Sequence, residues 1–559
     1  MRFSKIKEKS VLILLIVMTL VIVTGSMVND RQQMPEIKNV ILMVPDGTSI
    51  SHVTISRWYN GGEKLALDEI MSGFTRTYWK DGIITDSSAA ATAYSTGIKT
   101  KSGCVGVLPH EDTENDLQYN KPIATIIEAA NRAGLSTGIV CTSQLSDATP
   151  AGFSSHVNAR TCINDIVEQQ VYSDIDVLLC GGYNWYFSGN EEKNRKDGRV
   201  LKDEIVNNGY EFVTTKEELL NSKSNKIWGA FEPVSMTWDM FLDKDKYPAI
   251  DVMTNKAIEV LSKNEKGFFL MVEGSKVDWA SHRSDSVGVI SEVLAFDRAV
   301  GEALKFAKSR TDTVVIVSPD HGNGGLSIGG KTTDYNYDKL SVDAFIDPLK
   351  KVDYIPRELP NLLNEDKSNI RELMEEHMGV YDLTDEEEEL IRNAEGKWIG
   401  AQMNKALSKR ANLAWTTRGH TGEDVFLACY HPKGEGLRGV IENIDINHYI
   451  ASIFGVDLQS LSDKLFVEAK TAFEKKGYDV SFKDGAVREL VVSNGKDILR
   501  LPYNKNIAYL NDEEIKLSGI NVYTGTYIFV AEDTLTLLDK WWVKLRIYKK
   551  TEVSKSILE

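Results

Sequence analysis

The sequence has little cysteine, and this shortage limits both its crosslinks and its metal ligands. There are five cysteines in 559 residues, an odd number. Cys141, Cys180 and Cys429 lie in apolar runs, where a cysteine usually acts as a small buried hydrophobic side chain. The sequence does not fix any disulfide pairing, and a bridge that involves Cys162 is left open. Metal ligands, if there are any, must therefore come mainly from histidine, aspartate and glutamate.

The sequence also lacks an excess of positive charge. The formal net charge is −16 at pH 7. An acidic surface repels nucleic acid at long range, so we expect no nucleic-acid binding. The length and the hydrophobic share of 42% instead suit a globular protein with a substantial core and more than one domain.

One long apolar run stands out, and it lies at the N-terminus. "VLILLIVMTLVIV" occupies residues 11–23, after a basic leader and before "TGS". The run is short for a membrane-spanning helix and has the layout of a secretory signal. We predict that residues 1–25 are a signal peptide or an N-terminal anchor. In either case the body is exported: it is secreted or extracytoplasmic, in a periplasm or at a cell surface. The sequence leaves open an association with a cell surface or membrane through this segment.

Several other apolar runs have the length of strands that are covered on both faces. They are residues 39–44, 135–142, 176–182, 267–274, 313–320 and 426–431. Helical patterns lie between them, including "PIATIIEAANRAG", with Pro122 at its start and Gly134 past its end, and residues 287–310. This alternation predicts an α/β fold with a central, mostly parallel sheet flanked by helices on both faces.

The pattern changes at two places, which suggests additions to one main domain over residues 36–465. Residues 340–415 predict a helical insertion, in which Thr384 and Glu387 have capping-box spacing. Residues 475–550 have short alternating runs broken by turn residues, which predicts a small C-terminal β-rich accessory domain. No cluster of residues in that last segment suggests chemistry.

Acidic residues and histidines follow several of the predicted strands. They are Asp46, Glu273, Asp278, His282, Asp320, His321 and, ahead of the run at 426–431, His420. Each alone is more often a turn, a cap or a surface contact. Together they predict a ligand site, because ligands bind outside the carboxyl ends of strands in such sheets. Mixed nitrogen and oxygen donors suit zinc, and all-oxygen donors suit magnesium.

The stretch "TDSSAAATAYSTG", residues 85–97, adds a nucleophile to this set. Asp86 is a natural N-cap and Gly97 a natural C-cap for an alanine-rich helix, so Ser87 lies on the first turn. A metal ion can activate such a hydroxyl by direct coordination. The alternative is a plain core helix, which explains the alanines alone. Further on, Thr149 offers a hydroxyl ligand, and Arg160 a planar fork that matches phosphate oxygens.

With these residues the sequence resembles the alkaline phosphatase family. Five separated motifs carry the resemblance between about residues 38 and 460, in the family's order. They are "PDG", "TDSSAAATAYSTG", "DATPAGFSSHVNAR", "EGSKVDWASH" with "PDHG", and "HTGEDV". The resemblance makes residues 36–465 the catalytic domain, and the C-terminal segment falls outside it.

The resemblance also implies a role for each matched residue. Ser87 is the nucleophile and Arg160 binds the phosphate. The implied ligands are Asp278, His282 and His420 for one zinc ion, Asp46, Asp320, His321 and Ser87 for a second, and Asp46, Thr149 and Glu273 for magnesium. Trp279 follows Asp278 at a position where family members vary, so its effect on the third metal is left open.

The resemblance implies an exported phosphomonoesterase that works through a phosphoserine intermediate on two zinc ions and one magnesium ion. Its substrates would be small phosphate monoesters, and a homodimer is left open. Two alternatives also stay open. One is a phosphodiesterase or sulfatase-like hydrolase of the same superfamily, and the other is a non-catalytic metal- or phosphate-binding surface protein.

Overall fold

The computed structural model describes residues 37–112, 117–485, 487–525 and 527–539. The predicted N-terminal signal or anchor lies outside these residues. Within them, no helix combines the length and the apolar character that crossing a membrane requires. All five cysteines are unpaired, including Cys162.

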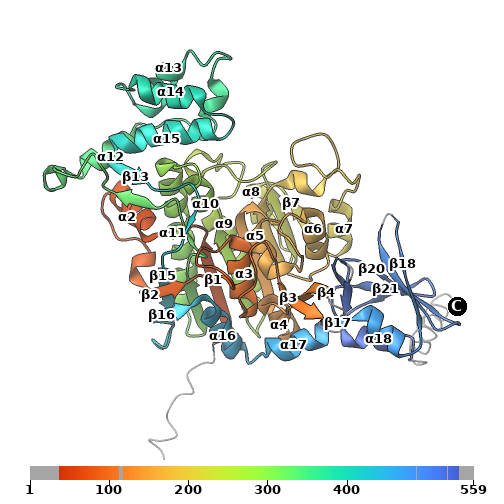
Figure 1. Ribbon diagram of the computed structural model, residues 1–559. Helices are drawn as coiled ribbons and strands as arrows, with labels where there is room; N and C mark the ends of the chain where they lie inside the picture. Colours follow the sequence, from red (N-terminus) through yellow and green to blue (C-terminus); the bar gives the residue numbers. More distant parts are fainter. Residues whose placement is uncertain (1–36, 113–116, 486, 526, 540–559) are drawn as a thin grey trace, which may run out of the picture.

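A mixed sheet of ten strands forms the centre of the molecule (Figure 1). β15 is antiparallel to both of its neighbours, β10 and β2, and all other neighbouring pairs are parallel. In spatial order the strands are β16 (Gly439–Glu442), β2 (Met71–Arg76), β15 (Val425–Tyr430), β10 (Thr313–Val317), β1 (Asn39–Pro45), β9 (Phe268–Gly274), β5 (Ser136–Gln144), β6 (Val177–Gly181), β8 (Ile227–Phe231) and β7 (Glu211–Val213).

Helices cover both faces of this sheet, because its strands are apolar on both sides. In β1, Val40, Leu42 and Val44 belong to one hydrophobic cluster, and Ile41 and Met43 belong to the other. The first face is covered by α3 (Ser87–Thr96), α4 (Ile126–Ala133), α5 (Ala148–Ser154), α6 (Ile163–Val171) and α16 (Asn443–Phe454). The second is covered by α2 (Ile50–Tyr59), α9 (Ile250–Leu261) and α11 (Ser286–Lys308). The predicted fold class is confirmed.

One predicted helix start is wrong. Pro122 does not open a helix but ends β4 (Leu117–Pro122), which pairs with β3 (Val107–Asp112). α4 begins four residues later, at Ile126, because Thr125 caps it together with Glu128 in a capping box. A reciprocal cap satisfies two amides at once, which outweighs the weaker preference for proline in the first turn. Gly134 does end the helix, with φ of 79°.

β12 (Leu326–Ile328) and β13 (Leu413–Trp415) form a separate two-stranded sheet. Four α-helices lie between them in the sequence, in the segment predicted to be helical. They are α12 (Asp343–Lys350), α13 (Ile370–Met378), α14 (Asp385–Asn393) and α15 (Trp398–Arg410). Thr384 caps α14 in a capping box with Glu387. The helices share a hydrophobic cluster with Ile55 of α2 and Ile290 of α11, so they are packed against the main body.

The C-terminal segment forms small antiparallel sheets at the other end of the molecule (Figure 1). One sheet has five strands: β18 (Asp479–Lys483), β19 (Glu489–Ser493), β20 (Ile498–Pro502), β21 (Ile507–Leu510) and β22 (Glu513–Lys516). The other has three: β17 (Val467–Glu468), β24 (Tyr527–Val530) and β23 (Val522–Thr524), beside α17 (Leu458–Leu465) and α18 (Ala469–Lys475). Val522 and Phe529 belong to the same hydrophobic cluster as α4 and α6, so this segment is docked on the main domain.

Because of this docking, Phe529 should stabilise the whole protein although it lies far from any chemistry. The side chain is 1% exposed. We expect Phe529→Ala to cost about 3 to 5 kcal/mol of unfolding free energy, as for other buried phenylalanines. Phe482→Ala is the control, because that ring lies in the same segment but is 43% exposed. Thermal unfolding of both variants checks this. Equal melting temperatures would mean that the C-terminal segment is not part of the cooperative core.

Candidate active site and metal centre

Three neighbouring strands bring acidic side chains to one edge of the sheet. β10, β1 and β9 are adjacent and parallel. Asp46 directly follows β1, Glu273 lies near the end of β9 opposite Val44, and Asp320 comes three residues after β10. The carboxyl ends of parallel strands lie on the same edge, which is where the sequence predicted this site.

The turn after β1 depends on a glycine. Gly47 has φ of +65°, and a Cβ there would lie 2.7 Å from Asp278 Oδ1. Its N–H donates to Asp320 Oδ1 at 3.0 Å. Only glycine adopts this conformation without strain and lets the two acidic side chains approach. The "PDG" motif therefore has a structural reason in addition to the carboxylate of Asp46.

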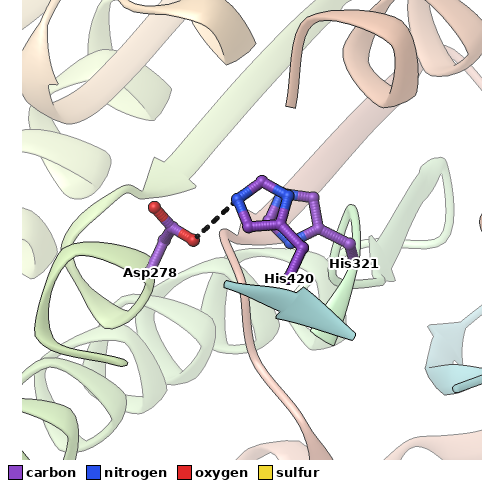
Figure 2. Close-up of side chains that lie close together, drawn as sticks. All are labelled: Asp278, His321 and His420. Carbon is purple, nitrogen blue, oxygen red and sulfur yellow. Dashed lines mark ion pairs between the residues drawn. The ribbon is translucent and has the colours of Figure 1, made fainter. Parts of the chain in front are cut away.

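Three histidines gather beside these carboxylates. β14 (His420–Thr421) pairs with β11 (Gly322–Asn323), which holds His420 next to His321. Their rings stack with centroids 3.7 Å apart (Figure 2), and the His282 ring lies 5.2 Å from that of His420. His282 follows α10 (Lys276–Ser281), one helical turn after Asp278.

Backbone carbonyls fix the protonation of all three imidazoles. Nδ1 of each ring faces a carbonyl oxygen: that of Arg418 for His282 at 2.7 Å, of Gly322 for His321 at 3.1 Å and of Thr85 for His420 at 2.8 Å. A carbonyl only accepts hydrogen bonds, so each Nδ1 carries the proton. In the neutral ring, Nε2 is then unprotonated and has a free lone pair, as in metal-binding histidines.

Those three Nε2 atoms face carboxylate oxygens. The distances are 3.3 Å from His282 to Asp278, 3.6 Å from His420 to Asp278, and 3.2 Å and 3.6 Å from His321 to Asp320 and Asp46. A lone pair next to a carboxylate is repulsive unless a cation lies between them. Ligand atoms around a tetrahedral zinc ion lie about 3.3 Å apart, given bond lengths of about 2.0 to 2.1 Å. The donor atoms therefore fit such ions.

The site contains two groups of possible metal ligands, and within each group the ligand atoms all lie within 4.8 Å of one another. One consists of Asp278, His321 and His420, and the other of Asp46, Asp320 and His321. The second matches three of the ligands implied for the second zinc ion. The first contains two of the three implied for the other, with His321 in place of His282, whose Nε2 lies 3.3 Å from Asp278. Asp46 Oδ1 and Asp320 Oδ2 are buried and have no hydrogen-bond partner among the described residues.

Burial and mutual repulsion keep part of this cluster from ionising. Burial, followed by the charge of Asp320, raises the pKa of Asp46 well above its usual value. Burial and then the charge of Asp147 do the same for the pKa of Glu273. Burial is also the main cause that raises the pKa of Asp320 to about 7. A bound cation would remove the repulsion and favour the ionised carboxylates.

Asp278 behaves differently because histidines surround it. Burial alone would raise its pKa, but the hydrogen bond and charge of His282, with the charges of His420 and His321, bring the pKa of Asp278 below its usual range. Burial acts to lower the pKa of His282, and so does the charge of Lys397, but Asp278 and the Arg418 carbonyl raise it overall. His282 is also the most open of the three histidines, with 37% of its side chain exposed.

α3 presents Ser87 to this cluster, as predicted. Asp86 caps the helix by accepting from the Ala89 N–H at 3.2 Å, and Gly97 ends it with φ of 73°. All ten helical residues are buried. α3 packs closely on α5, because a Cβ at Gly152 would lie only 2.6 Å from Ala91 Cβ. Ser87 Oγ lies 3.3 Å from His321 Nε2.

Thr149 and Arg160 come from the segment after β5. Thr149 Oγ1 lies 3.4 Å from Asp46 Oδ2, so oxygen donors gather beside Asp46. Arg160 donates to Asp147 at 3.0 Å and lies 4.0 Å from Asp86. Its side chain is 36% exposed, so part of its fork faces solvent. The structure thus gathers the predicted residues around one cluster, although, in the part of the chain that the structure describes, Glu273 forms no hydrogen bond with Thr149 and Arg160 forms none with Ser87.

Sequence reasoning missed the residues that hold these groups in place. Asp147 orients Arg160, and Asn323 donates to Asp278 at 2.6 Å. Asp147 stands beside the predicted Thr149, so its position was a usable signal. Asn323 lies two residues after His321, and no feature of the sequence pointed to its role. The Trp279 ring lies with Trp238 in a small hydrophobic cluster. Lys276 Nζ lies 5.5 Å from the centroid of the Trp279 ring.

Comparison with known proteins assigns the chain to a family. A model of the alkaline phosphatase family matches residues 37–456. Alkaline phosphatase 3 of Bacillus subtilis (strain 168) is 34% identical over 436 residues, which cover 74% of this chain and 87% of that protein. The crystal structure of Thermus thermophilus alkaline phosphatase superposes with a TM-score of 0.66 at 26% identity, covering 76% of this chain and 94% of that chain.

A further solved structure is that of a mutant alkaline phosphatase from the Antarctic bacterium TAB5, with Mg bound in its M3 site. It is 25% identical to this chain, with a TM-score of 0.54 and coverage of 76% of this chain and all of that one. The family model spans most of the sequence and the whole sheet described above. The chain belongs to the alkaline phosphatase family and is a phosphatase enzyme.

Proposed function

We propose that this chain is an exported phosphomonoesterase in which Ser87 forms a phosphoserine intermediate. The observation that carries this proposal is the contact between Ser87 Oγ and His321 Nε2, at 3.3 Å, beside two groups of carboxylates and imidazoles. A serine hydroxyl needs such surroundings to become a nucleophile.

The helix around Ser87 supports its role. The first turn of α3 has unpaired amides and the positive end of the helix dipole, which favour negative charge on or near this serine. The burial of all of α3 limits the movement of the hydroxyl. Ser87 would attack phosphorus in line with the leaving alcohol and form a P–O bond as the ester bond breaks. Water then hydrolyses the phosphoserine.

Arg160 would neutralise the phosphate oxygens that do not react. Asp147 orients one side of its guanidinium, and the exposed remainder can take two oxygens with its fork. A monoester offers two or three such oxygens, whereas a diester replaces one of them with a second organic group. The arginine therefore favours a monoesterase over the phosphodiesterase or sulfatase-like alternative.

The donor set supports two zinc ions and one magnesium ion. Asp278, His282 and His420 would hold the first zinc ion, Asp46, Asp320 and His321 the second, and Asp46, Thr149 and Glu273 magnesium. When bound, these ions supply Lewis acids that stabilise the negative charge of the reacting phosphate. Mixed nitrogen and oxygen donors are typical of zinc, and an all-oxygen set is typical of magnesium. Such a complete arrangement disfavours a non-catalytic binding protein.

Ser87→Ala should lower kcat for a simple monoester by about a thousandfold or more, because the covalent route is lost. Metal content, measured by elemental analysis, should stay near normal, because the carboxylates and imidazoles remain. Ser95→Ala is the control, because Ser95 lies on the same helix but donates to the Gly152 carbonyl. Labelled phosphate trapped on any residue other than Ser87 would overturn the assignment.

Arg160→Ala should lose roughly 2 to 4 kcal/mol of transition-state stabilisation for a monoester, the range for removing one charge-stabilising donor. The loss for a diester with the same leaving group should be much smaller. Arg160→Lys keeps the charge without the fork, so its kcat/KM for the monoester should lie between those of the wild type and Arg160→Ala. Measuring kcat/KM for both substrates tests this. A wild-type preference for the diester would contradict the proposed reaction class.

The acidic cluster should make the metal-free protein less stable as pH rises. The pKa of Asp320 is raised to about 7, and those of Asp46 and Glu273 are raised too. Carboxyl groups of this kind stabilise the fold while protonated, and the contribution is lost as pH rises through about 7. After chelation, the melting temperature should therefore fall as pH rises from about 5 to about 7.5.

Zinc and magnesium should restore stability most at the higher pH, because metal ions bind the deprotonated groups. Asp320→Asn is the matched variant, because it removes one titrating group from the buried cluster. Its metal-free form should lose less stability over the same pH range. Equal stabilisation by metal ions at both pH values would argue against binding at this cluster.

A further inference from the structure

Arg160 lies in a loop whose position depends on contacts from other elements. Residues 155–162 join α5 to α6, and Val157 pairs with Val105 in one antiparallel bridge. The N–H of Arg160 donates to the Gly103 carbonyl at 2.8 Å. A group that binds a reacting phosphate needs accurate placement, because an error of about 1 Å can cost about a hundredfold in rate. The side chains that hold this loop therefore affect how well Arg160 works.

Gln169 of α6 holds the loop at His156, four residues before Arg160. The His156 N–H donates to Gln169 Oε1 at 2.8 Å, and Gln169 Nε2 donates to the His156 carbonyl at 3.0 Å. The imidazole of His156 faces the Gly106 carbonyl with Nδ1 at 2.8 Å and Glu128 with Nε2 at 3.2 Å. Gln169 and His156 are both buried. The backbone and the side chain of His156 are therefore both fixed.

Asn504 of the C-terminal segment fixes Gln169 in turn. Its Oδ1 accepts from Gln169 Nε2 at 3.1 Å, and its Nδ2 donates to Asp165 Oδ1 at 2.9 Å. Asp165 and Gln169 are one turn apart on α6. Asn504 is 3% exposed and has φ of 59°, a backbone conformation that asparagine adopts more readily than most residues. A buried side chain from the C-terminal segment thus completes the hydrogen bonds of the residue that holds His156.

A second series of hydrogen bonds reaches the same loop. Thr524 Oγ1 of β23 donates to the Asn120 carbonyl of β4 at 2.7 Å, and Asn120 Nδ2 donates to Asn158 Oδ1 at 2.9 Å. Figure 1 shows β4 beside the C-terminal segment. Asn158 lies two residues before Arg160. Both series start in the C-terminal segment and end within four residues of the arginine.

We propose that Asn504 and Thr524 are positioning residues for Arg160, so that the C-terminal segment strengthens the preference for phosphate monoesters. This inference rests on the proposed function, in which Arg160 takes the phosphate oxygens that do not react. Both residues act through the loop without touching the substrate, and the reaction itself is unchanged. Their role differs from that of Phe529, which stabilises the fold as a whole, because it concerns the geometry of one substrate-binding group.

The test compares kcat/KM for a monoester and for a diester with the same leaving group, using the metal-loaded full chain. Asn504→Gly removes both side-chain hydrogen bonds and tolerates the positive φ. We expect it to lower the ratio of monoester to diester kcat/KM by roughly two- to thirtyfold, the range for residues in such networks, and by less than Arg160→Ala does. Both substrates are measured on one preparation, so a smaller folded fraction lowers both values equally and leaves the ratio unchanged.

Asn506→Gly is the matched control. Asn506 is also 3% exposed, and its Nδ2 donates to the Tyr172 carbonyl at 2.6 Å and to Asp174 Oδ2 at 3.1 Å. These partners follow the end of α6, whereas Gln169 lies within it. The control should lower the melting temperature, because it loses docking hydrogen bonds, but it should keep the substrate ratio of the wild type.

Thr524→Val tests the second series, because it removes the hydroxyl and keeps the shape of the side chain. It should lower the ratio too, and Thr524→Ser, which retains a hydroxyl, should keep the ratio near the wild-type value. In an Arg160→Ala background, Asn504→Gly should cause no further fall in the ratio, because its effect passes through Arg160.

An unchanged ratio in Asn504→Gly or in Thr524→Val would overturn the role of that residue while leaving the proposed function intact. An equal fall in Asn506→Gly, or a further fall in the Arg160→Ala background, would overturn the inference as well, because the effect would then not depend on the arginine. If Arg160→Ala itself left the ratio unchanged, the proposed role of Arg160 would be wrong, and this inference with it.

Discussion

The active site is organised around one electrostatic constraint, the close approach of imidazole lone pairs to buried carboxylates. Three histidines are oriented by backbone carbonyls so that each Nε2 faces an acidic oxygen at 3.2 to 3.6 Å. Such an arrangement is unfavourable in the bare polypeptide. It is stable only with protons or cations between the donor atoms. The raised pKa of Asp46, Glu273 and Asp320 is the response of the metal-free chain to the same constraint.

The sheet can hold this arrangement because it is rigid and covered on both faces. β1 lies between β10 and β9, so backbone pairing holds Glu273 within β9 and fixes the strand ends that Asp46 and Asp320 follow. Gly47 then allows Asp278 to approach where any side chain would collide. α3 adds the serine from a fully buried helix. The repulsion is thus distributed over elements whose packing is strong enough to resist it.

The residues predicted for this site lie close together in the structure, and the signals that singled them out are local in the sequence. Asp46 and Asp320 each follow a buried apolar run, and Asp86 and Gly97 bound a helix of small residues. The carbonyls of Thr85 and Arg418 could not be predicted, because a carbonyl has no sequence signature and its partner lies far along the chain. The start of α4 was predicted too early, since Pro122 matched the rule for helix starts but belongs to a hairpin. The docking of Phe529 was missed because an apolar residue in a β pattern does not reveal which core it joins.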